Sequence, residues 1–177
     1  MKKGKLLHSA LSHEIAKLGH TQTLVLGDAG LPIPPETRRI DLAVTQGVPA
    51  LLSVLDAVLS ELAVQKITLA EEIKTASPEM DRSIRSRFPG TQICYVPHEA
   101  FKALLPQAAC VVRTGETTSY ANVILESGSP FSVGPPAFGT AGSGRFLPDK
   151  QLPAASLPDS RGNPGRPGKK DPLPRRL

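Results

Sequence analysis

The sequence has few of the residues that build disulfide frameworks, metal sites and aromatic binding surfaces. Its 177 residues include two cysteines, no tryptophan and only 4% aromatic side chains. No Cys-x-x-Cys pair or Cys/His cluster has the spacing of metal ligands, so we expect no metal site. Cys94 and Cys110 both lie in apolar segments. We interpret them as two buried free thiols in a reducing compartment.

Long apolar runs and the common cofactor motifs are also missing. No stretch approaches the ~18 consecutive apolar residues of a transmembrane helix. Polar residues interrupt the segment after the basic start Met1–Lys5, which argues against a signal peptide. The sequence contains no GxGxxG, P-loop, Gly-x-Ser-x-Gly or His-Glu-x-x-His motif. We therefore expect a cytoplasmic protein without membrane association, nucleotide or redox cofactor.

Positive charge is concentrated in the last part of the chain. Residues 132–177 hold eight Lys/Arg and three Asp/Glu, and subtraction from the totals of 21 and 16 leaves 13 of each in residues 1–131. Nine of the 18 prolines and seven of the 15 glycines also fall in 132–177. Such a composition predicts a disordered tail after a folded domain of residues 1–131. Nucleic-acid binding is disfavoured, because the domain is neutral and the tail lacks interleaved aromatic residues.

Apolar spacing in residues 1–131 alternates between helix and strand patterns. Residues 7–18 repeat leucine or isoleucine every three or four positions, which is typical of one helix face. Short apolar runs between glycines, prolines and polar residues indicate strands. We expect strands at 23–26, 39–43, 65–70, 91–96, 108–113 and 122–126, and further helices at 49–62, 78–87 and 97–105. This order predicts an α/β layered fold with a mostly parallel central sheet flanked by helices.

His20 and Asp28 bracket the strand expected at 23–26. Histidine titrates near neutral pH and can both give and take a proton, although a histidine after a helix can also cap backbone carbonyls. Asp28 lies among glycine and alanine neighbours, where its carboxylate either binds sugar hydroxyls, orients an imidazole or stabilises the turn into Gly30. The pair favours proton transfer on a small polar molecule. Asp41, in a later strand, is interpreted as a buried structural acid rather than a catalytic one.

Further candidate residues follow later strands. His98 opens the helix expected at 97–105 and either reaches a pocket or caps that helix. Lys102, one turn further on, either reaches the same spot or lies on a solvated face. Tyr120 and Asn122 precede the last strand and either present a phenol and an amide to a polyol or belong to an ordinary loop.

Nine short runs occur in order across residues 1–131 without large gaps, and their set is more specific than any one of them. They are Met1–Gly4, Leu18–Thr21, Asp28–Pro34, Arg39–Ala43, Gln46–Pro49, Ala70–Lys74, His98–Lys102, Arg113–Glu116 and Tyr120–Asn122. Together they resemble the ribose pyranases, a family of small sugar mutarotases of ribose-uptake operons. The related fucose mutarotases share the early histidine pattern, but the runs at 28–34 and 46–49 look more like the ribose branch.

The resemblance implies both an activity and a site. It implies an isomerase that interconverts the pyranose and furanose forms, and the anomers, of D-ribose without a cofactor. His20 matches the catalytic acid/base of the family. The family's sugar-binding positions match Asp28, His98, Lys102 and the run Tyr120-Ala121-Asn122. Family members form ring-shaped pentamers paired into decamers with pockets at subunit contacts, so residues of different chains are expected to meet.

The sequence departs from the family's pattern at two positions, and two alternative functions remain open. Gln22 stands where an acid is common in the family, which puts the orientation of His20 in question. Ser119 replaces the usual proline before Tyr120 and loosens that loop. A non-catalytic monosaccharide-binding accessory protein of a sugar-uptake system, or a fucose-type mutarotase, would carry much of the same pattern.

Overall fold

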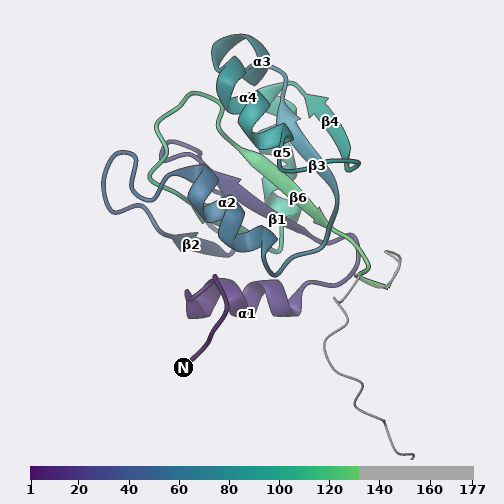
Figure 1. Ribbon diagram of the computed structural model, residues 1–177. Coiled ribbons are helices and arrows are strands. Elements are labelled where there is room, and N and C mark those ends of the chain that lie inside the picture. Colours follow the sequence, from purple (N-terminus) through teal and green to yellow (C-terminus); the bar gives the residue numbers. More distant parts are fainter. Residues whose placement is uncertain (132–177) are drawn as a thin grey trace, which may run out of the picture. The chain divides into compact units, whose positions relative to one another are not determined.

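The structure is a computed structural model that describes residues 1–131, and the predicted tail at 132–177 lies outside the described residues. Six strands form one sheet in the order β2-β5-β1-β6-β3-β4, with helices on both faces (Figure 1). The elements are α1 (Ser9–Lys17), β1 (Thr23–Gly27), β2 (Arg39–Asp41), α2 (Leu51–Leu59), β3 (Val64–Ala70), α3 (Ile73–Ala76), α4 (Pro78–Arg85), β4 (Gln92–Val96), α5 (His98–Leu104), a 3₁₀ turn (Leu105–Gln107), β5 (Cys110–Arg113) and β6 (Val123–Ser127).

Five of these six strands run in one direction, in agreement with the predicted mostly parallel sheet, and β6 runs in the other. The pairs β2–β5, β5–β1 and β3–β4 are parallel, whereas β6 is antiparallel to both β1 and β3. The cause is the short connection 114–122, because a parallel return would need a crossover of about a dozen residues or more. The start of β6 therefore lies at the same sheet edge as the ends of the other strands.

Alternate side chains of the central strands enter two separate apolar clusters. Leu24 and Leu26 of β1 join the cluster covered by α1, α2 and α4, while Val25 joins the cluster beneath α5 with Phe101 and Leu105. This alternation follows from the two-residue side-chain period of a strand. Burial on both faces makes the sheet a rigid support for the loops at the amino and carboxyl ends of its strands.

Two predictions of burial are wrong, and for the same reason. Cys94 is only half-buried and Asp41 is exposed, because they lie in β4 and β2, the two edge strands of the sheet. Cys110 lies in the interior strand β5 and is buried as predicted, and burial raises the pKa of its thiol to about 11. A neutral, inaccessible thiol of this kind is inert.

Candidate active site

Four predicted sugar-binding residues line one pocket at the carboxyl edge of the sheet. Asp28 follows β1, His98 begins α5, and Tyr120 and Asn122 precede the antiparallel β6. They surround a cavity of about 270 Å³. Ligands of α/β sheets bind at this edge, and the reversed direction of β6 is what brings its first residues there.

Asp28 and Asn122 hold each other through reciprocal hydrogen bonds. The Asp28 N–H donates to Asn122 Oδ1 at 2.8 Å, and Asn122 Nδ2 donates to Asp28 Oδ2 at 2.9 Å. Asp28 Oδ1 accepts a third bond from the Gly30 N–H at 2.9 Å. Since each carboxylate oxygen has a second lone pair, Asp28 can stabilise the turn and still accept from sugar hydroxyls.

The ring of His98 contacts Tyr120, and Glu72 fixes the backbone of His98. The two ring centroids lie 5.1 Å apart in an edge-to-face arrangement. The His98 N–H donates to both carboxylate oxygens of Glu72 at 3.0 Å, and this bond lowers the pKa of the Glu72 carboxyl. His98 Nδ1 is buried and has no hydrogen-bond partner among residues 1–131. A buried polar atom without a partner is rare and is a mark of functional sites.

Lys102 and Ala121 do not present side chains to this pocket. Lys102 Nζ pairs with the Glu99 carboxylate at 2.6 Å and is not among the lining residues. The Ala121 side chain is fully buried, so only its backbone can face a ligand. The sugar-binding roles of both residues stay predictions.

His20 lies at the opposite, amino edge of the sheet. It precedes β1 whereas Asp28 follows it, and a rise of ~3.3 Å per residue makes the five-residue β1 roughly 13 Å long. Proton transfer requires heavy atoms about 2.6–3.2 Å apart, or one bridging water. A sugar bound at Asp28 is therefore out of reach of His20 in the same chain.

A strained turn presents His20 to solvent. The Gln22 N–H donates to the Gly19 carbonyl at 3.2 Å, and Gln22 Oε1 accepts from the Gly19 N–H at 2.7 Å. Thr21 has a φ of +68°, which is rare for a β-branched residue, and its N–H donates to Ser127 of β6. Gln22 thus closes the turn instead of contacting the imidazole.

Gln65 contacts the imidazole of His20, and sequence reasoning missed it. His20 Nε2 lies 2.9 Å from Gln65 Oε1, and Gln65 Nε2 donates to Glu126 Oε1 at 2.8 Å. Glu126 also forms an ion pair with Lys66. The Lys66 ion pair and hydrogen bond, followed by the bond from Gln65, lower the pKa of Glu126 despite partial burial. Glu126 is therefore ionised at neutral pH.

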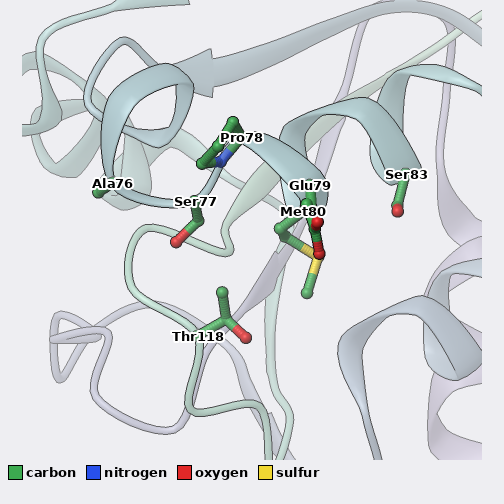
Figure 2. A pocket seen from close by; sticks show the side chains of 7 residues that line it. All are labelled: Ala76, Ser77, Pro78, Glu79, Met80, Ser83 and Thr118. Atoms are coloured by element: carbon green, nitrogen blue, oxygen red, sulfur yellow. The ribbon is translucent and has the colours of Figure 1, made fainter.

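A larger hollow of about 540 Å³ lies next to the pocket but has little catalytic chemistry. Figure 2 shows Ser77, Glu79 and Met80 near the start of α4, with Thr118 opposite them. Glu79 is the one ionisable side chain among the described residues that line it. Ser119, the neighbour of Thr118, lines the smaller pocket and accepts a bond from the Ser77 hydroxyl at 2.9 Å. The hollow thus shares a loop wall with the pocket and offers no acid/base pair.

Arg113 fixes the backbone that follows Asp28. Its Nε donates to the Ala29 carbonyl at 2.8 Å, and its Nη1 contacts both Asp41 oxygens at 3.2 and 3.0 Å. Arg39 Nη2 donates to the same carboxylate at 2.8 Å. The slight desolvation of the exposed Asp41 carboxylate acts to raise its pKa, but the bonds from Arg113, the Ala43 N–H and Arg39 outweigh this effect and lower the pKa.

We expect Arg113→Leu to lower the free energy of unfolding by about 1.5–3 kcal/mol, the range of a hydrogen bond to a charged group, and to weaken binding of the monosaccharide that the sequence resemblance implies. Arg39→Leu is the matched control, because it removes the other arginine on Asp41 and leaves the Ala29 bond intact. The control should cost ~1 kcal/mol or less, as an exposed ion pair does. Urea unfolding measures the stability of both variants, and calorimetric titration with the expected monosaccharide measures their binding. Equal effects of the two variants would show that the Ala29 bond contributes nothing.

Neither a metal centre nor a membrane span occurs in the described part of the chain. No three His, Cys, Asp or Glu side chains of residues 1–131 gather in an arrangement that could hold a metal ion. None of the helices in that range has the length and apolar character that a bilayer crossing requires.

Comparison with known proteins identifies the family. The RbsD / FucU transport protein family matches residues 1–130. D-ribose pyranase of Geobacillus kaustophilus (strain HTA426) is 54% identical over 132 residues, which are 75% of this chain and 97% of that protein. D-ribose pyranase of Enterococcus faecalis (strain ATCC 700802 / V583) is 51% identical over 131 residues, 74% of this chain and 100% of that protein.

Solved structures give the same result. Bacillus subtilis RbsD complexed with D-ribose is 42% identical and has a TM-score of 0.71, covering 73% of this chain and 98% of that one. The fucose mutarotase of Streptococcus pneumoniae, solved with L-fucose, shares the fold with a TM-score of 0.64 at 24% identity, covering 73% and 99%. The predicted fold class is confirmed. With a match over nearly all of residues 1–131 and relatives more than half identical, this chain belongs to the RbsD / FucU transport protein family.

Proposed function

We propose that this chain is a cofactor-independent isomerase that interconverts the pyranose and furanose forms, and the anomers, of D-ribose. Relatives at 54% and 51% identity are D-ribose pyranases. The observation that carries the proposal is the pocket at the carboxyl edge of the sheet. It combines the acceptors and donors that a polyol needs, contributed by Asp28, His98, Tyr120 and Asn122.

The reaction requires proton transfer at two oxygens of the sugar. Opening the ring removes a proton from the anomeric hydroxyl and delivers one to the ring oxygen, and closing through another hydroxyl reverses both steps. We assign this shuttle to His20, because an imidazole can give and take a proton near neutral pH. The Asp28 carboxylate and the Asn122 amide would hold the hydroxyls in place during the open-chain stage.

A complete site then needs two copies of the chain. His20 and the pocket lie beyond opposite ends of β1, and His20 is exposed on its turn. We infer that His20 of one copy reaches the pocket of another. The finer expectation of pentameric rings paired into decamers stays a prediction, which native mass spectrometry can test. A cytoplasmic location also stays a prediction.

Saturation-transfer NMR on D-ribose tests the proposed activity. We expect the full chain to accelerate exchange between pyranose and furanose signals, and to do so less for L-fucose. Acceleration of fucose above ribose would instead assign the fucose-type activity.

A non-catalytic sugar-binding protein is the second candidate. A single unassembled chain would behave in this way, because its His20 lies too far from its own pocket to transfer a proton to a bound sugar. Ribose binding in calorimetry without faster exchange, in a sample shown to be oligomeric, would establish it and would contradict the isomerase.

A further inference from the structure

A chain of polar contacts connects His20 to a cross-strand ion pair. Lys66 of β3 and Glu126 of β6 are direct partners in the antiparallel register. Glu126 accepts from Gln65 Nε2 at 2.8 Å, and Gln65 Oε1 lies 2.9 Å from His20 Nε2. The contacts thus run in series from a lysine ammonium to the imidazole.

The direction of every hydrogen bond in this series is determined by chemistry. An ionised carboxylate can only accept. Glu126 is ionised at neutral pH, and Lys66 lowers its pKa further below the ordinary value. The end of the Gln65 amide that faces Glu126 must therefore be the NH₂ group, which leaves the carbonyl oxygen facing His20. An amide oxygen only accepts, so the bond to His20 requires a hydrogen on Nε2.

We propose that Glu126 and Gln65 hold neutral His20 as the Nε2–H tautomer, which makes Nδ1 the atom that exchanges protons with the sugar. This inference rests on the proposed role of His20 and names the atom that performs it. Gln65 and Glu126 are positioning residues, because they act through His20 and lie on the amino edge of the sheet, away from the pocket of their own chain.

The proton balance of the step follows from this assignment. The anomeric O–H bond breaks as an N–H bond forms at Nδ1, and the imidazole becomes an imidazolium. The ring C–O bond then breaks, its electron pair goes to the ring oxygen, and Nδ1 returns the proton to that oxygen as the aldehyde forms. Throughout, Nε2–H stays bonded to the Gln65 oxygen.

A charge swap tests the proposal without removing the ion pair. In Lys66→Glu/Glu126→Lys, the new ammonium at 126 donates to the Gln65 oxygen and turns the amide, so that its NH₂ group faces His20. Nε2 must then accept, and the hydrogen moves to Nδ1. Lys66→Met is the control, because it leaves the contact between Gln65 and Glu126 in place.

The measurement is ¹⁵N NMR of histidine-labelled full chain at a pH where the ring is neutral, with His20 assigned by its absence in His20→Ala. We expect hydrogen on Nε2 in the wild type and in Lys66→Met, and on Nδ1 in the swap. Ribose exchange in the swap should fall by roughly 10²-fold, the lower end of general acid/base catalysis. Glu126→Gln, which perturbs the fold least, should populate both tautomers and lose less activity.

Two results would overturn the proposal. The first is a wild-type His20 with its hydrogen on Nδ1. The second is a folded swap, or Glu126→Gln if the swap does not fold, whose tautomer and exchange rate equal those of the wild type. Failure of the proposed function is separate, since it would appear as full exchange activity in His20→Ala whatever the tautomer.

Discussion

His20→Ala is expected to slow ribose ring exchange by roughly 10²–10⁴-fold, the contribution of a well-placed general acid/base, while ribose binding survives. The binding groups lie in the pocket at the carboxyl edge, and the His20 side chain lies at the amino edge. Because His20 is exposed and bonds to Gln65 through one nitrogen, its removal should cost ~1 kcal/mol or less of unfolding free energy. Saturation-transfer NMR and ribose calorimetry measure the two effects.

His13→Ala provides the matched control for this variant. It makes the same chemical change at an exposed position of α1, so its exchange rate and stability should both stay close to those of the wild type. If His20→Ala retains the wild-type exchange rate, His20 is not the proton shuttle. If it loses ribose binding as well as exchange, its role is in the pocket and not in the chemistry.

Most strands and long helices of the fold follow from apolar spacing, because a buried face imposes its period on the sequence. The β1 run Thr23–Gly27 and the apolar face of α2 are of this kind. Helix α3 (Ile73–Ala76) was not predicted, since its four residues are too few to show a helical period. The direction of β6 depends on the length of the connection before it, which the spacing within the strand does not encode.

Some residues of the candidate site could likewise be predicted from the sequence, and others could not. Residues just after strand ends, such as Asp28 and His98, are detectable because that edge collects ligands. Gln65 and Glu126 are separated by 61 positions and meet only through strand pairing, so no local pattern indicates them. Likewise, the spacing that puts His20 and Asp28 at opposite ends of β1 does not reveal which chain supplies each group to a given sugar.

Mixing His20→Ala with His98→Ala, which should lose activity because it removes a pocket side chain, is expected to restore activity if each site is shared between chains. His20→Ala keeps an intact pocket, and His98→Ala keeps an intact His20 turn. The His98 backbone bond to Glu72 survives the second substitution, because it uses the main-chain N–H. In a randomly mixed 1:1 oligomer, about one site in four joins a good pocket to a good histidine, so about a quarter of the wild-type exchange rate should return.

A second mixture distinguishes a site shared between two chains from a site within one chain by an independent measurement. When wild-type chains are co-refolded 1:1 with the double variant His20→Ala/His98→Ala, a shared site again leaves about a quarter of the wild-type activity, whereas a site within one chain leaves about half. The two mixtures must agree. A first mixture no more active than its separate components, together with half activity in the second, would place His20 and His98 in the same chain's site and reject the two-copy arrangement. If both mixtures instead retain a quarter of the wild-type activity, catalysis requires assembly. The reason would be that His20 and Asp28 lie beyond opposite ends of β1 and cannot act on the same sugar from one chain.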